Sequence, residues 1–194
     1  MTREILLIIF AYLLGSIPTG LLLAKAVGVD IRSSGSGNIG ATNVYRTLGR
    51  SVGIMTLAGD CLKGLIPVVA ASWLGMSVNW LAAIGLAAFL GHIYTIFLGF
   101  KGGKGVATAL GVFLAVSPPA VASTLVIFVA VVWKWRYISL GSIIAAMAIP
   151  GLIAVFDARP AIVIMTIVIA LLVVWKHREN IKRLKDGTES KFKA

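Results

Sequence analysis

Two short segments of this chain combine glycine, neutral polar side chains and cations in a pattern that suits phosphate binding. The first covers residues 35–43, with the sequence GSGNIGATN, and Arg46 follows it. Its glycines allow the backbone to approach a ligand closely and to turn N–H groups towards an anion. Arg46 would add a planar fork that matches phosphate oxygens. The candidate ligand contacts in and beside this segment are Ser36, Gly37, Asn38, Thr42, Asn43 and Arg46. A flexible polar loop that ends in a helix N-cap is the alternative interpretation.

The second segment covers residues 99–105, with the sequence GFKGGKG. It resembles a nucleotide-binding phosphate loop only locally, because Gly105 follows Lys104 where that motif needs a hydroxyl residue for magnesium. We therefore expect no hydrolysis of nucleoside triphosphates. We expect the segment to precede a helix, so that free N–H groups of Gly102, Gly103 and Gly105 hold a phosphate while Lys101 and Lys104 supply charge. Lysines at a span end commonly serve as anchors, but anchoring does not explain four glycines among these seven residues.

A third set of polar residues follows the last apolar stretch. His177 and Asn180 are three residues apart and would share one face of a helix. The lysines around them are expected to hold an interfacial tail on anionic lipid, a task to which neither His177 nor Asn180 contributes much. Ser142, inside an apolar stretch, is either a ligand or an ordinary helix-packing serine.

Asp60 and Lys63 are also three residues apart, within an apolar stretch. Each charge alone would cost roughly 2.5–3.5 kcal/mol at the centre of a bilayer. We predict a structural ion pair near the cytoplasmic side. With two histidines, one cysteine and seven acidic residues, the chain shows no ligand spacing typical of a metal site, and we expect neither metal nor cofactor.

The elements that must position these residues are apolar. Hydrophobic residues make up 59% of the 194 and charged residues 13%, which excludes an ordinary soluble domain. We predict one all-α integral membrane domain over residues 1–194 with seven transmembrane helices. The expected spans are 4–27, 52–74, 79–98, 104–117, 119–134, 138–156 and 160–176. Residues 15–20, GSIPTG, should bend the first span. A count of five remains open, since the fourth and fifth stretches could form a re-entrant pair.

Charge predicts the orientation of the chain. If the C-terminal tail is cytoplasmic, all lysines and arginines except Arg3, Lys63 and Arg159 fall on or near the cytoplasmic face. An odd number of spans then places the N-terminus outside. The net charge of +11 is consequently attributed to orientation and to anionic lipids or substrates, and no nucleic acid partner is expected.

Three ordered motifs together resemble a known family. They are Ser-Gly-Asn-x-Gly-Ala-Thr-Asn with its following Arg, Gly-His…Phe-Lys-Gly-Gly-Lys-Gly, and the terminal His-Arg-x-Asn-Ile-x-Arg-Leu…Gly-Thr-Glu. The chain is similar over nearly its whole length to the bacterial acyl-phosphate:glycerol-3-phosphate acyltransferases of the PlsY type. Asp60-x-x-Lys63-Gly64 and Gly15-Ser16-Ile17-Pro18 match that family too.

The resemblance implies transfer of a fatty acyl group from acyl phosphate to the 1-position of sn-glycerol 3-phosphate, which releases lysophosphatidate and phosphate. It also implies a multi-pass protein of the bacterial inner membrane whose active face is cytoplasmic, with membrane lipid around it and no obligate protein partner. On this basis we expect catalytic roles for Ser36, Arg46, Lys104, His177 and Asn180. We expect substrate-binding roles for Gly37, Asn38, Thr42, Asn43, Lys101, Gly102, Gly103, Gly105, Ser142 and Glu189.

Two questions stay open at this point. His177 is the best candidate for a general base, but a substrate phosphate could take the proton instead, with His177 and Asn180 only binding. A small organic-phosphate transporter is the main alternative function, although its polar groups would be expected near the middle of the membrane.

Overall fold

A computed structural model describes residues 2–192, and every regular element among them is helical. The chain divides into two compact units, one up to Ala115 and one from Val116. The structure therefore agrees with the predicted all-α class. The prediction of one polytopic domain stays a prediction.

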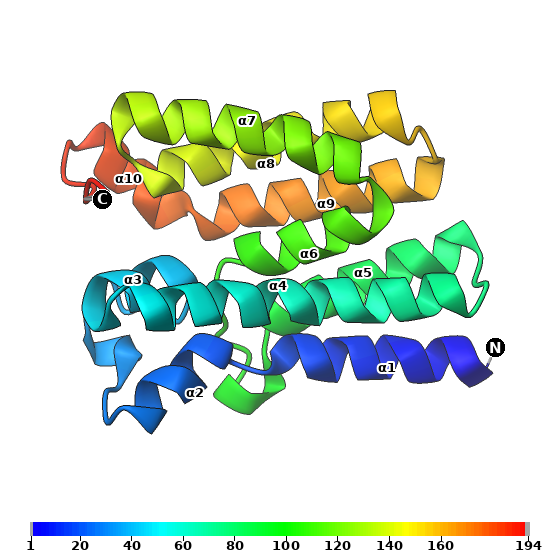
Figure 1. Ribbon diagram of the computed structural model, residues 1–194, viewed down its shortest axis with the longest axis horizontal. Helices are drawn as coiled ribbons and strands as arrows, with labels where there is room; N and C mark the ends of the chain where they lie inside the picture. Colours follow the sequence, from blue (N-terminus) through cyan, green and yellow to red (C-terminus); the bar gives the residue numbers. More distant parts are fainter. Residues whose placement is uncertain (1, 193–194) are drawn as a thin grey trace. The chain divides into compact units, whose positions relative to one another are not determined.

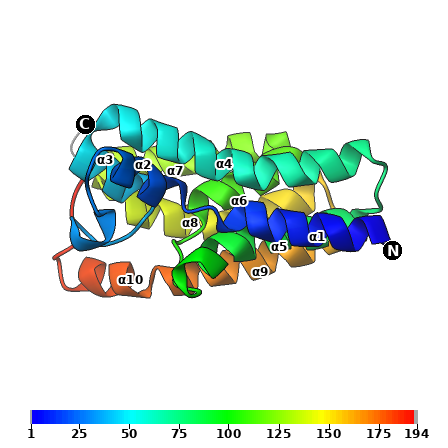
Figure 2. The ribbon, with the colours of Figure 1, turned by 90° about the horizontal axis from the view of Figure 1, so that it is seen from below.

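The first unit carries both glycine-rich segments. Its helices are α1 (Thr2–Ser16), α2 (Thr19–Ala26), η1 (Ile31–Ser33), α3 (Ala41–Leu48), α4 (Arg50–Trp73), α5 (Val78–Ile93), η2 (Ile96–Leu98) and α6 (Val106–Val116), the last of which reaches one residue into the second unit. Helix α1 packs mainly against α5, and α4 packs against α1, α3 and α5. Figures 1 and 2 show α2 and α3 at the end of this unit that lies away from the N-terminus.

The second unit consists of α7 (Pro118–Trp135), α8 (Ile138–Phe156), α9 (Pro160–Lys176) and α10 (Arg178–Lys185). Helix α8 packs against both α7 and α9, and the short α10 contacts α8 and α9. Prolines occupy the first turns of α7 and α9, where the missing N–H costs nothing.

The predicted bend of the first apolar stretch is confirmed. Helix α1 ends at Ser16, α2 begins at Thr19, and the two axes differ by 41°. Pro18 lacks an N–H and fixes its own φ, so it cannot continue the α1 hydrogen-bond ladder. A second break of 53° separates α9 from α10 at His177.

By length and composition, four helices could each span a membrane: α4, α5 with its extension to Leu98, α7 and α8. The number rises to six if the bent pairs α1–α2 and α9–α10 each form one span. The predicted count of seven would also need α6. That helix has 11 residues, which corresponds to a length of only about 16 Å against the roughly 30 Å of a bilayer core. The structure thus gives helices over all seven predicted stretches, while the number that cross a membrane stays a prediction.

Candidate active site

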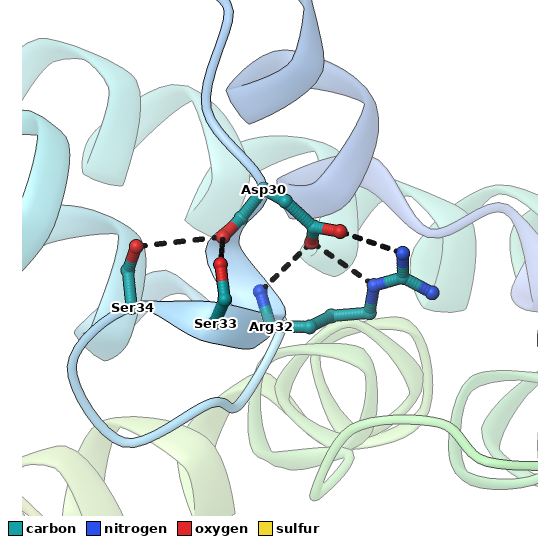
Figure 3. Close-up of polar contacts among 4 residues, drawn as sticks. All are labelled: Asp30, Arg32, Ser33 and Ser34. Carbon is teal, nitrogen blue, oxygen red and sulfur yellow. Dashed lines mark hydrogen bonds and ion pairs between the residues drawn. The ribbon is translucent and has the colours of Figure 1, made fainter.

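A small hydrogen-bonded turn around Asp30 precedes the first glycine-rich segment. The Asp30 carboxylate accepts the backbone N–H of Arg32 at 3.0 Å and the Arg32 guanidinium at 3.0 and 2.7 Å. The Asp30 carbonyl accepts the hydroxyls of Ser33 and Ser34, as Figure 3 shows. Hydrogen bonds from the side chain and backbone of Arg32 lower the pKa of Asp30 to about 2. This partly exposed pair therefore stays ionised at neutral pH and shapes the entry to the loop.

Asn43 fixes the path of the loop from inside. It is 2% exposed, and its Oδ1 accepts the N–H of Ser36 at 2.8 Å. Its Nδ2 donates to the carbonyls of Asn38, Ser34 and Ile31 at 2.9, 3.0 and 3.3 Å. A Cβ on Gly35, whose φ is +58°, would lie 2.3 Å from Asn43 Oδ1, so glycine is required there. The side chain of Asn43 is committed to the loop itself.

The remaining predicted residues of this segment lie at or near the surface. Ser36, Gly37 and Arg46 are exposed, whereas Asn38 and Thr42 are half-buried. Asn38 Oδ1 accepts the N–H of Gly40 at 2.8 Å, immediately before α3 begins at Ala41. Arg46 lies in the last turn of α3. The loop therefore presents the Ser36 hydroxyl and backbone groups at the surface, and α3 carries the exposed Arg46 guanidinium after it.

The second glycine-rich segment folds back onto the end of α5. Gly102 N–H donates to Ile93 O at 3.3 Å, and Gly103 N–H donates to His92 O at 3.2 Å. The expectation that these two N–H groups are free for a phosphate is therefore wrong. The amides pair with carbonyls at the end of α5, which a helix leaves without intrahelical donors.

Glycine is needed in this segment because of close packing. A Cβ would lie 2.0 Å from His92 O at Gly102 and 2.3 Å from His92 Nε2 at Gly103. At Gly105, whose φ is +82°, it would lie 2.3 Å from the Phe89 ring. Lys104 is half-buried and Lys101 exposed, and α6 begins directly after Gly105 as predicted. The first-turn N–H groups of α6 and the Lys104 ammonium remain the groups suited to an anion.

A hydrophobic cluster links the two segments. It is formed by Leu21, Ala24, Ile31, Ile39 and Val44 from α2, η1, α3 and the first loop. Leu98 packs against this cluster from η2, just before the second segment begins. The two glycine-rich segments of the first unit are thus supported by the same hydrophobic cluster.

In the second unit His177 lies at the break between α9 and α10. Its side chain is 3% exposed, and its Nδ1 lies 2.8 Å from Val173 O. A carbonyl only accepts, so Nδ1 carries the proton in this hydrogen bond. The neutral ring then has its basic lone pair on Nε2. This arrangement suits a proton acceptor.

Asn180 and Glu189 belong to one buried network. Glu189 Oε1 accepts Ser139 Oγ at 2.6 Å and Asn180 Nδ2 at 2.7 Å, and Oε2 accepts Arg183 Nε at 2.7 Å. Burial acts to raise the pKa of Glu189, but the hydrogen bonds from Ser139, Asn180 and Arg183 outweigh it and hold the pKa below the usual value of 4.5. The carboxylate ties the tail to α8 and α10.

No sequence pattern marks Ser139 or Arg183 as functional. Ser139 is 50 residues from its partner Glu189, and no local pattern signals such a contact. Arg183 looks like one basic residue among several in an anchoring tail. Ser142, 5% exposed, donates to Ile138 O within α8 at 2.9 Å, a bond typical of a helix-packing serine.

Comparison with known proteins identifies the family. The family model described as "Glycerol-3-phosphate acyltransferase" matches residues 5–187. The chain is 73% identical to the glycerol-3-phosphate acyltransferase of Geobacter metallireducens and 69% identical to that of Geotalea daltonii, in each case over 100% of both proteins. The chain belongs to the glycerol-3-phosphate acyltransferase family.

Solved structures agree with this assignment. The crystal structure of PlsY (YgiH), an integral membrane glycerol 3-phosphate acyltransferase, in its glycerol 3-phosphate form matches with a TM-score of 0.95 and 46% identity. The match covers 98% of this chain and 96% of that one. The lysophosphatidic acid form matches with a TM-score of 0.92 and 45% identity. This acyltransferase is therefore an integral membrane enzyme of the PlsY type.

Proposed function

We propose that this acyltransferase moves a fatty acyl group from acyl phosphate to the 1-hydroxyl of sn-glycerol 3-phosphate. The bond between the acyl carbon and the phosphate oxygen breaks, and an ester bond forms to the glycerol oxygen. The products are lysophosphatidate and inorganic phosphate. The main support is the relative solved in glycerol 3-phosphate and lysophosphatidic acid forms, which this chain matches over 98% of its length.

The two glycine-rich segments of the first unit are proposed to hold the phosphates. Both substrates carry one, and an acyl phosphate is already activated. Positioning and neutralisation of the leaving phosphate therefore supply much of the catalysis. Lys104 and the start of α6 would bind one phosphate, with Lys101 near it. Arg46, Ser36 and Thr42, with the backbone at Gly37, would bind the other. The Asn43 amide donates to the Asn38 carbonyl within the loop, and the Asn38 side chain accepts the N–H of Gly40. These bonds support a positioning role for both residues.

His177 is proposed as the general base on the glycerol hydroxyl. Its Nδ1 is held by Val173 O, which leaves Nε2 as the basic nitrogen. Asn180 and Glu189 would keep the start of α10 in place beside it, because Glu189 accepts three hydrogen bonds from Ser139, Asn180 and Arg183. Ser142 lies one turn after Ser139 and is proposed to face the same substrate.

We further propose seven spans in the bacterial inner membrane, with α6 as a short one, an external N-terminus and a cytoplasmic active face. The cationic residues outside the apolar stretches support this orientation. The acyl chain would stay among the apolar helices while both phosphates remain at the cytoplasmic side.

A reconstituted assay tests the proposal. Purified protein in liposomes should release phosphate from palmitoyl phosphate only when glycerol 3-phosphate is added, with one lysophosphatidate formed per phosphate. Lys104→Ala and Arg46→Ala should each lose most of this turnover while still inserting in the membrane. Uptake of glycerol 3-phosphate into the vesicles without turnover would instead identify a transporter.

A further inference from the structure

A buried ionic cluster lies near the middle of α4, outside the residues assigned to the reaction. Lys63 Nζ is 2.8 Å from Asp60 Oδ1, and His92 Nδ1 on α5 is 3.8 Å from the same oxygen. The three residues are only 2–4% exposed. The predicted pair is confirmed, but it lies in the middle of the 24-residue helix rather than near one end. Replacement of such pairs by apolar side chains is often neutral or stabilising, so stability alone does not account for them.

One end of this cluster holds the break between α1 and α2. The carbonyls of Ser16 and Ile17 take donors outside the α1 ladder, because the helix stops at Ser16. Ile17 O accepts the backbone N–H of Thr19 at 3.0 Å. Thr95 Oγ1 donates to Ser16 O at 2.6 Å. Lys63 Nζ donates to Ile17 O at 2.7 Å. Lys63 therefore pairs with Asp60 on its own helix and also connects α4 to the break between α1 and α2.

The other end of the cluster lies beneath the second glycine-rich segment. His92 O accepts the N–H of Gly103, and a Cβ on Gly103 would lie 2.3 Å from His92 Nε2. The carbonyl and the ring of one residue thus determine the path of the backbone immediately before Lys104. A change in the orientation of His92 would move that backbone.

We propose that Asp60, Lys63 and His92 are positioning residues that hold the Gly102–Lys104 backbone in its phosphate-binding arrangement. Lys63 is anchored at Ile17, Asp60 holds Lys63 and faces His92, and His92 supports Gly103. The cluster touches no reacting atom and acts through the loop. This inference rests on the proposed function, because it explains how Lys104 is aimed at a substrate phosphate.

The first test replaces the pair together, as Asp60→Leu with Lys63→Met. Apolar side chains of similar volume should leave the midpoint of thermal unfolding near that of the wild type. The KM for one of the two phosphate substrates should rise about tenfold or more, because a misplaced loop weakens contacts at one phosphate. A purely structural defect would instead lower the amount of active enzyme and move neither KM.

His92→Leu gives an independent measurement and should raise the KM for the same substrate. Thr56→Val is the matched control. Thr56 is fully buried on α4, one turn before Asp60, and its hydroxyl donates to Val52 O of the same helix. Both KM values of this control should match the wild type.

The outcomes separate the two proposals. A wild-type protein without turnover would contradict the proposed function itself. An active wild type with unchanged KM values in a folded double variant or a folded His92→Leu variant would overturn the positioning role alone. Loss of folding in both would also overturn it and assign the cluster to stability.

Discussion

At the residue scale, the chemistry of His177 depends on the carbonyl of Val173. That carbonyl accepts from Nδ1 at 2.8 Å, so the imidazole presents Nε2 as its basic nitrogen. Because α9 ends at Lys176, Val173 O lies in the last turn of the helix, where it also accepts the backbone N–H of His177 at 3.1 Å. The helix end thus fixes the tautomer that a general base needs.

His177→Ala should therefore lower kcat by about 100-fold or more at every pH, because a base makes its contribution in the transition state. The pH dependence of kcat and KM in liposomes measures this. A variant with near-normal kcat and a raised KM would show that His177 only binds, and a substrate phosphate would then be the proton acceptor.

Glu189 makes a separate contribution to stability. Its pKa in the folded protein lies below the usual 4.5, so its stabilising effect is complete above about pH 4.5 and is lost as the pH falls through the lower folded pKa. Glu189→Gln sets an amide against the donors Asn180 and Arg183. The substitution should lower the free energy of unfolding by roughly 1–3 kcal/mol at pH 7.

The thermal unfolding midpoint in detergent, measured from pH 7 downwards, checks this expectation. The difference in unfolding midpoint between wild type and Glu189→Gln should disappear as the pH falls below 4.5. Glu179→Gln changes an exposed residue of α10 and should leave the midpoint nearly unchanged. A gap of equal size at both ends of the pH range would contradict the account.

At the scale of elements, the second glycine-rich segment depends on backbone packing rather than on flexibility. Gly102 approaches His92 O so closely that a Cβ would lie 2.0 Å away, and a backbone carbonyl cannot turn aside as a side chain can. Gly102→Ala should therefore displace the loop and reduce turnover more than about tenfold.

Gly151→Ala is the matched control for this change. Gly151 lies in α8, and a Cβ there would meet nothing within 4 Å. Its turnover should equal that of the wild type. Membrane insertion of both variants should be normal, and wild-type kinetics in Gly102→Ala would show that the close packing has no bearing on activity.

The sequence predicts the elements of this fold better than the contacts between them. Apolar stretches and prolines predicted the helices and the break at Pro18, and the cost of isolated charges predicted the Asp60–Lys63 pair. It did not predict that Gly103 donates its N–H back to His92, because that bond depends on how the loop folds over α5. Nor did it predict that Ser139 donates to Glu189, since 50 residues separate them.

At the scale of the whole molecule, the account requires that every phosphate-binding candidate face the same aqueous compartment. An acyl phosphate, whose fatty chain lies in the membrane, and a water-soluble acceptor can meet only at one surface of the bilayer. The distribution of lysine and arginine predicts that this surface is cytoplasmic. Side-specific cysteine labelling measures it, and the single native cysteine makes a cysteine-free background simple to prepare through Cys61→Ala.

The most direct measurement places one cysteine at a time in sealed inverted and right-side-out vesicles. Ser33→Cys, Lys101→Cys and Asp186→Cys lie at exposed positions in or next to the two glycine-rich segments and the tail, and Ser77→Cys lies exposed before α5. The account predicts that an impermeant maleimide labels the first three only from the cytoplasmic side and Ser77→Cys only from the outside. Labelling of Ser33→Cys and Lys101→Cys from opposite sides would contradict it.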